Sequence, residues 1–111
     1  MYAKTLLKKV EALFNSVRER DRKICEEFEL ECSDLLADTT AVIKGQAVIV
    51  TYDGVGYNQL SYESELPYLL ADLGFQPDEE PELRKKLRKL AEKCGFILED
   101  HNSYQCGLYP C

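Results

Sequence analysis

The chain has 111 residues, a formal net charge of −6, and 45% hydrophobic and 31% charged residues. This apolar fraction is too high for a disordered chain, and the charged fraction is too high for a membrane protein. The length fits one domain spanning 1–111. A chain of this size buries roughly two-thirds of its unfolded surface, so it can fold without a metal or a disulfide.

The N-terminus and the cysteines indicate the compartment. Lysines interrupt the apolar residues of 1–14, whereas a secretory signal needs a continuous apolar stretch. No apolar run approaches the roughly 20 residues that span a bilayer. The cysteine count is odd, which is typical of free thiols: Cys25, Cys32, Cys94, Cys106 and Cys111. We therefore expect a cytoplasmic protein without membrane association.

Residues 1–38 contain neither Gly nor Pro and carry apolar residues at helical spacing. One apolar stripe covers 6–17 and another covers 24–36, with the purely charged run 18–23 between them. A single helix of about 35 residues would be far longer than the globular mean. The pattern therefore favours two helices that meet near Asp21 over one long bent helix.

β-branched residues then predict a sheet. Residues 41–43 form a candidate short strand, and 46–52 is the strongest strand pattern in the chain. The two glycines of 53–56 favour a tight turn. We expect 57–62 to return as the strand that pairs with 46–52.

Two further helices and a hairpin complete the chain. A helix is predicted over 64–74, and another begins at a capping Asp78 and closes at Gly95. The hairpin is expected to pair 96–100 with 104–108, with His101 in its turn. The sequence thus predicts a single small α+β domain, with about four helices packed on antiparallel β-hairpins in the order α-α-β-β-β-α-α-β-β.

The charges are strongly segregated along the chain. Residues 1–24 carry a net charge of +4 and 79–111 carry none, whereas 25–78 carry −10. The stretch 45–78 holds no Lys or Arg, and 25–78 includes four of the seven tyrosines. Acids and tyrosines without cations favour a positively charged partner, because acids steer the encounter and Tyr provides contact area at small entropic cost.

These features predict a small acidic interaction module that binds a basic protein surface. In its sharper form it inhibits a partner by mimicking nucleic acid in a nucleic-acid-binding groove. A solvated acidic face that serves solubility is the alternative. The predicted partner-binding residues are Glu26, Glu27, Glu29, Asp34, Asp53, Tyr57, Tyr62 and Glu63. We expect no cofactor, and a homodimer through the first helix remains open.

Catalytic and metal-binding patterns are weak. The spacing of Cys94, His101, Cys106 and Cys111 lacks the close ligand pairs of zinc sites, and nothing orients His101 to activate Cys106. Neighbouring Glu99 and Asp100 would point to opposite faces of a strand. We therefore expect neither a metal site nor an enzyme.

A basic helix offers a second hypothesis. Arg84, Lys85, Arg88 and Lys89 lie on the helix that precedes the terminal hairpin. The order of elements over 64–109 is similar to that of a winged helix, which would place this helix in a DNA major groove. The alternative function is therefore a nucleic-acid-binding regulator, although the net charge makes nucleic acid the less favoured partner.

Overall fold

A computed structural model describes residues 2–27, 39–52, 60, 81–102 and 104–111, with the backbone alone at 21, 24, 25 and 82. The described helices are α1 (Ala3–Glu27) and α3 (Glu82–Lys93). The described strands are β1 (Thr40–Lys44), β2 (Ala47–Thr51), β3 (Phe96–Asn102) and β4 (Gln105–Pro110). These ranges confirm an α+β fold.

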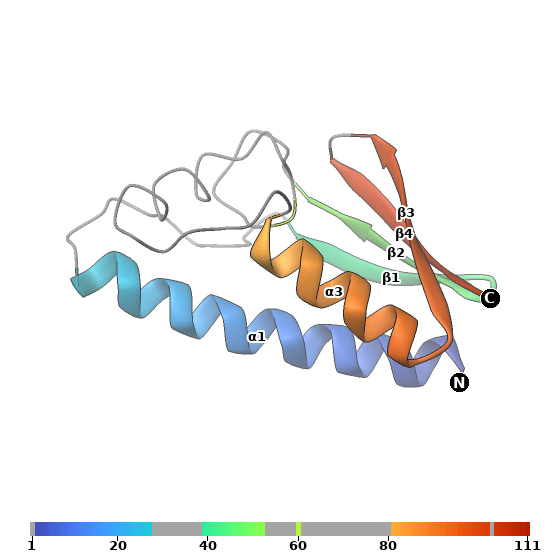
Figure 1. Ribbon diagram of the computed structural model, residues 1–111, viewed down its shortest axis with the longest axis horizontal. Coiled ribbons are helices and arrows are strands. Elements are labelled where there is room, and N and C mark those ends of the chain that lie inside the picture. Colours follow the sequence, from blue (N-terminus) through green and yellow to red (C-terminus); the bar gives the residue numbers. More distant parts are fainter. Residues whose placement is uncertain (1, 28–38, 53–59, 61–80, 103) are drawn as a thin grey trace.

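The four strands form one antiparallel sheet in the order β1-β2-β4-β3. β1 and β2 make a hairpin in which Thr40 pairs with Thr51, and β3 and β4 make a second hairpin. The two hairpins join where β2 pairs with β4, so that Val48 lies opposite Leu108. Both helices lie on one face of this sheet (Figure 1).

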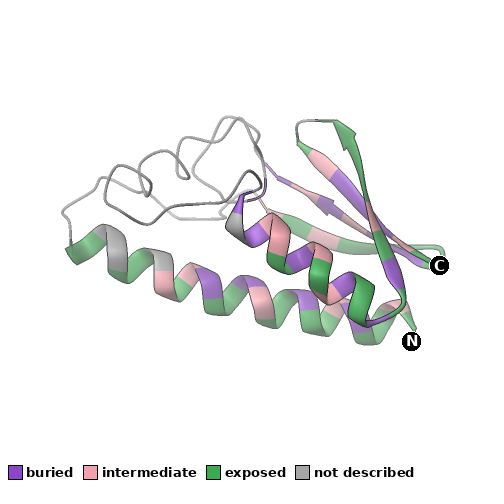
Figure 2. Ribbon diagram, viewed as in Figure 1, coloured by how far each residue is buried: buried purple, intermediate pink, exposed green. Residues whose placement is uncertain are grey.

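The core lies between the helices and the sheet (Figure 2). Alternate residues of β2 and β4 point into it, as the period-2 pattern of a half-buried strand requires. The helices contribute their apolar stripes. The most deeply buried large side chains are Leu6, Val10, Val48, Val50, Leu60, Leu83, Leu87, Phe96, Cys106 and Leu108.

The predicted break near Asp21 is wrong, because α1 continues through it to Glu27. The charged run 18–23 is rich in Arg, Glu and Lys, which have high helix propensity. Within it Arg22 forms an ion pair with Glu19 one turn earlier. A helical turn without apolar residues is thus a solvent-facing extension of the helix and not a boundary.

The expected count of about four helices is not supported, since the described residues form two. The remainder of the second predicted helix falls on 28–38, outside the described residues, as does the helix predicted over 64–74. The strand predicted at 57–62 lies outside them too, apart from the buried Leu60. Its predicted partner β2 has β1 on one side and β4 on the other.

α3 begins later than predicted. Pro81, not Asp78, occupies the N-cap position, and its carbonyl accepts a 2.9 Å hydrogen bond from the Lys85 amide. Proline disfavours helical φ/ψ angles at the residue before it, so the sequence opposes a helix that runs through residue 80. The predicted end is confirmed, because Gly95 adopts a positive φ of 81° directly after the C-cap.

The terminal hairpin is confirmed, but its strands are longer than predicted. His101 lies in β3 and not in the turn. An irregularity in the ladder between Asp100 and Asn102 accommodates the extra residue.

Candidate functional site

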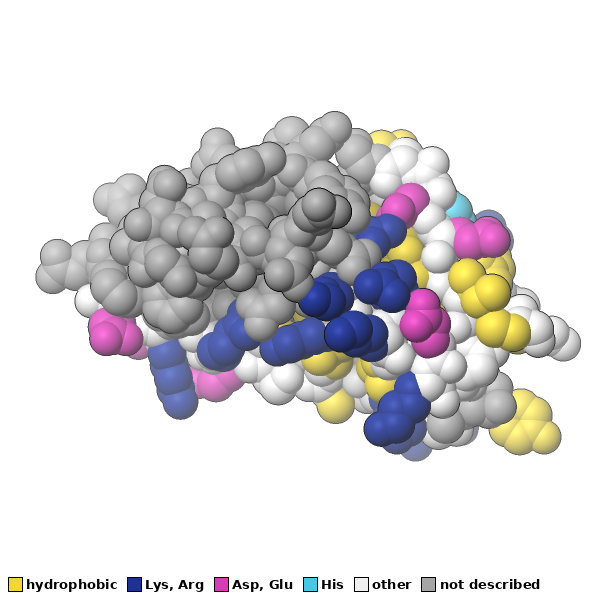
Figure 3. Space-filling model, in the orientation of Figure 1, with side chains coloured by type: hydrophobic (Ala, Val, Ile, Leu, Met, Phe, Trp, Pro, Cys, Tyr) yellow, Lys and Arg dark blue, Asp and Glu magenta, His cyan; other side chains and the backbone are white. Residues whose placement is uncertain are grey.

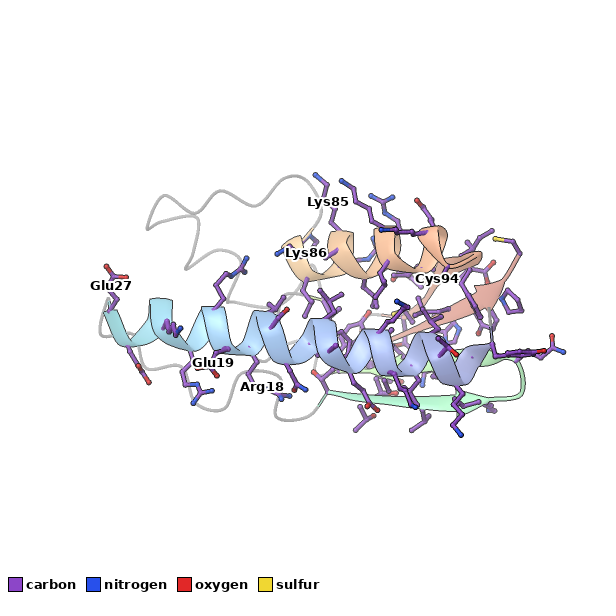
Figure 4. All side chains as sticks on the ribbon, turned by 90° about the horizontal axis from the view of Figure 1, so that it is seen from below. Arg18, Glu19, Glu27, Lys85, Lys86 and Cys94 are labelled. Carbon is purple, nitrogen blue, oxygen red and sulfur yellow. The ribbon has the colours of Figure 1, made fainter. Side chains whose placement is uncertain are left out.

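Most of the predicted acidic docking residues fall outside the described part of the chain. Glu26 and Glu27 are exposed at the end of α1, where Figure 4 labels Glu27. The other six lie in undescribed segments: Glu29, Asp34, Asp53, Tyr57, Tyr62 and Glu63. The structure therefore places two of the eight predicted residues.

The fold does show where the acidic segments are attached. Residues 28–38 connect the end of α1 to β1, and 53–80 connect β2 to α3. The start of β1 and the end of β2 are neighbours, since Thr40 pairs with Thr51. α3 begins at the same end of the sheet, and α1 runs past it on that side (Figure 1). Both segments thus join the fold at one end.

The described residues carry the opposite charge from the chain as a whole. They include all fourteen Lys and Arg residues but only nine of the twenty Asp and Glu residues, a net charge of +5. The other eleven acids belong to 28–38 and 53–80, which contain no cation. The segregation seen along the chain is therefore also a division between the described fold and the two segments attached at its end.

Cations of α1 and α3 meet on one face of the molecule. Figure 3 shows Lys and Arg side chains gathered over α3 and along the neighbouring part of α1. On α3 the exposed members are Lys86, Lys89 and Lys93. Sequence reasoning weighed the basic N-terminal region and the basic helix separately, and it missed this shared face because nothing local indicates that α1 packs against α3.

Arg84 and Arg88, which were predicted to bind nucleic acid, take part in ion pairs within the fold. Arg84 pairs with Asp100 of β3, with its side chain only 11% exposed. Arg88 pairs with Glu92 one turn later on α3, at 3.3 Å between Nη1 and Oε1. Lys85 is partly buried, and Lys89 is exposed. Arg84 therefore fixes α3 to the sheet rather than extending into solvent.

The terminal hairpin is not a separate wing. β4 is an inner strand, paired with β2 on one side and β3 on the other. The Tyr52 amide also donates a 2.8 Å hydrogen bond to the Tyr104 carbonyl beside the hairpin turn. The hairpin is half of the main sheet, so the similarity to a winged helix stops at the order of elements.

Cys106 and His101 lie on opposite faces of the sheet. Cys106 is buried in the core, where burial raises the pKa of its thiol to about 12. Its hydrogen-bonded neighbour is Tyr52, whose pKa is also raised by burial. A buried, protonated thiol is a poor nucleophile, and His101 cannot reach it.

His101 instead belongs to a polar chain on the outer face. Its Nε2 lies 2.5 Å from the Tyr109 hydroxyl, and its Nδ1 lies 2.9 Å from Oε1 of Gln105. Gln105 Nε2 donates to the Thr51 hydroxyl at 3.2 Å. With Nδ1 protonated, every group in this row has a complementary partner.

The remaining chemical candidates are dispersed. Cys94 is buried at the end of α3, where Figure 4 labels it, and Cys111 is exposed at the last position. Asp100 reaches Arg84 on the helix side, while Glu99 alternates to the other face as predicted. Among the residues that the structure describes, no group of three His, Cys, Asp or Glu side chains could hold a metal ion.

Comparisons of the chain with protein-family models, with curated proteins and with solved structures find no match. Across the described ranges, no helix combines the length and hydropathy required for crossing a bilayer.

Proposed function

We propose that the protein is a non-catalytic binding module whose acidic segments dock on a basic surface of a partner protein. The observation that carries this proposal is the shared attachment of 28–38 and 53–80 at one end of the fold. Eleven acids without a cation are tethered there, beside the exposed Glu26 and Glu27. Such an anionic end steers association with a cationic surface and fixes its orientation.

The sharper form of the proposal makes the module an inhibitor. A groove that binds nucleic acid offers closely spaced cations to a row of phosphates. The eleven acids of 28–38 and 53–80 supply a comparable number of negative charges in two short segments. The partner is therefore a nucleic-acid-binding protein, and occupation of its groove excludes the nucleic acid.

The free thiols of Cys94, Cys106 and Cys111 support a cytoplasmic location.

The first test uses a labelled decalysine peptide as a defined cationic probe. Glu26, Glu27 and Glu29 are each changed to Lys, and binding is followed by fluorescence anisotropy from low to physiological salt. We expect the triple change to weaken binding at least tenfold at low salt, because it reverses charge at the acidic end. The fold should persist, since Glu26 and Glu27 are exposed.

A charge-matched control separates location from net charge. Changing Glu19, Glu92 and Glu99 to Lys also moves the net charge from −6 to 0, but on exposed positions of the described fold. This variant should keep most of the affinity. Equal losses in the two triple variants would show that decalysine senses only net charge, and the docking end would be rejected.

The second test addresses inhibition. The wild-type protein is immobilised and exposed to a lysate, and the retained proteins are challenged with excess duplex DNA. Release by DNA of a nucleic-acid-binding protein, which then fails to bind the Glu26/Glu27/Glu29 triple variant, supports groove occupation. Retention that duplex DNA does not disturb argues against mimicry.

The basic face over α1 and α3 favours a second candidate function, in which the protein binds nucleic acid directly (Figure 3). Lys86, Lys89 and Lys93 are exposed on α3 and could contact phosphates. A gel shift at low salt tests it with single-stranded and duplex probes. Retardation that is lost when these three lysines become Ala supports the candidate, and absence of any retardation eliminates it.

A further inference from the structure

β1 is an edge strand, and no strand of the described chain pairs with its second side. Four of its five residues are exposed. Val42 and Ile43 remain 53% and 42% exposed. α1 contacts this strand from the helix face and leaves the edge itself uncovered (Figures 1 and 4). Such an edge presents unpaired N–H and C=O groups to any extended chain.

The opposite edge of the sheet is protected in ways that β1 lacks. β3 carries Glu99 and Asp100, and its ladder is irregular between Asp100 and Asn102. A helix packs on one face of each edge strand, α3 on β3 and α1 on β1, so the charges and the irregular ladder are what distinguish the two edges. Charges and bulges are usual protections of edge strands. β1 has a regular register, no proline, and one charge at its end.

We propose that β1 is a homodimerisation strand, which pairs antiparallel with β1 of a second copy of this chain. A two-fold axis at Val42 places Thr40 opposite Lys44 of the copy, and Val42 opposite its own equivalent. No like charges face each other in this register. The contact is the same surface on both copies, and the other edge is protected, so assembly closes at two chains and one continuous eight-stranded sheet.

The dimer would also bury exposed apolar surface. Val42 pairs with Ile49 of β2 and points to the sheet face away from the helices. Across the new seam, Val42 and its equivalent would lie side by side between the two Ile49 residues. β-branched side chains favour strands because they pack against cross-strand neighbours on the same face. The half-exposed Val42 thereby gains the neighbour that the single chain does not provide.

The helices bring charges of both signs to this arrangement. Arg18 lies on the β1 side of α1 in Figure 4, and the N-terminal half of α1 runs beside β1. Lys4 and Glu11 share the side of Arg18, which they precede by 14 and 7 residues, and Lys8 shares it because it lies four residues after Lys4 and three before Glu11. A two-fold axis would set the two copies of this half antiparallel, with Lys4 of each toward Glu11 of the other and the two Lys8 side chains near each other. The helix charges therefore add both attraction and repulsion, and the strand pairing carries the proposal.

The test compares charge variants at one position. Val42→Lys places two lysines opposite each other, and Val42→Glu places two glutamates there. Each variant alone should shift the monomer–dimer equilibrium in sedimentation velocity at least tenfold toward monomer, because like charges directly opposite destabilise a strand pair. An equimolar mixture of the two should restore the dimer. The matched control is Ile97→Lys on β3, which is 48% exposed and should leave the equilibrium unchanged.

Several results would overturn the proposal. One is a wild-type chain that remains monomeric up to about 1 mM. At that concentration even a small, weak protein–protein interface is populated. In that case the open edge of β1 would be available to pair with a strand of another protein. Others are a mixture of Val42→Lys and Val42→Glu that stays monomeric, and an equal effect of Ile97→Lys. The readout is oligomeric state, so failure here leaves the decalysine test of the acidic end unaffected.

A second measurement does not require any variant to fold. A dilution series of the ¹⁵N-labelled wild-type chain should move the amide signals of Thr40–Lys44 together, with one dissociation constant. Concentration-dependent shifts confined to Phe96–Asn102 would place the interface at the other edge and contradict β1 pairing.

Discussion

Gly107 is needed because the ring of Tyr109 lies directly over it. A Cβ built at Gly107 would come 2.4 Å from Cε2 of Tyr109, which is too close for any real contact. The ring is held there by the 2.5 Å hydrogen bond between the Tyr109 hydroxyl and His101. The contact between Gly107 and the Tyr109 ring could not be predicted from the sequence. Strand periodicity predicts the face of the sheet to which a side chain points, but not where its ring lies on that face.

Replacing Gly107 with Ala should therefore destabilise the fold through Tyr109. The added methyl forces the ring aside and breaks its bond to His101, and overpacking of this kind costs about 1–3 kcal/mol. In a Tyr109→Ala background the same substitution should cost little. Urea unfolding of the four members of this double-mutant cycle measures the coupling. A cost at Gly107 that is the same in both backgrounds would contradict the proposed contact.

The buried pair Tyr52 and Cys106 makes stability depend on alkaline pH. Both pKa values are raised by burial, that of Cys106 from 9.0 to about 12. In the unfolded chain the thiol loses its proton above pH 9.0, whereas the folded chain keeps it. Stability is therefore intact below pH 9 and falls above it, by up to about 1.4 kcal/mol per pH unit for the thiol. Tyr52 adds to the fall only above its ordinary pKa of 10.0.

Unfolding by urea between pH 8 and 11 checks this dependence. We expect the free energy of unfolding to fall more steeply in the wild type than in Cys106→Ala, whose side chain cannot ionise. The comparison uses the slopes with pH, because removal of the thiol also leaves a small cavity. Parallel slopes would show that Cys106 is not the titrating group.

At the scale of elements, the local sequence pattern predicted helices and strands best where no charged turn interrupted the apolar periodicity. The β2 strand, the C-terminal end of α3 and the final hairpin were predicted because periodicity, Gly95 and β-branched residues all agree there. α1 was divided wrongly at Asp21, because a charged turn was read as a boundary. Pro81 was passed over as the start of α3 in favour of a good capping residue. The first error gave the polarity of a turn more weight than its helix propensity, and the second gave a capping preference more weight than the backbone constraint of proline.

A proline scan tests the continuity of α1. Asp21→Pro removes an amide from the interior of the helix and clashes with the preceding turn, so it should cost about 3 kcal/mol or more and lower the helical signal in circular dichroism. Tyr2→Pro precedes the first helical residue and should be nearly neutral. If proline at 21 is tolerated as well as proline at 2, the helix is interrupted there, as the sequence alone suggested.

At the scale of the whole molecule, one core connects every described element. Leu6 and Val10 of α1, Leu87 of α3, and Val48 and Leu108 of the sheet belong to the same buried cluster. β2 and β4 pair although their partner residues lie 54 to 60 positions apart in the chain. A cluster that draws on both ends of the chain predicts one cooperative unit.

Leu87→Ala tests this unity. Removal of a fully buried leucine should cost about 2–5 kcal/mol. Because the core is shared, the helical signal in circular dichroism and the tyrosine fluorescence should shift together along the urea axis. Separate transitions for the two signals would show that α1 and the sheet unfold independently.

The sequence by itself determined the α+β class, the strand-rich middle and end, and the separation of charge along the chain. These depend on local spacing and composition, which a linear reading contains. Tertiary structure alone decided that β2 lies beside β4, that α1 and α3 combine their cations, that both acidic segments attach at one end, and that β1 is left as an open edge. The physical reason is that period-2 and period-3.6 patterns tell which face of an element is buried, whereas the choice of neighbour is made by packing between residues far apart in the chain.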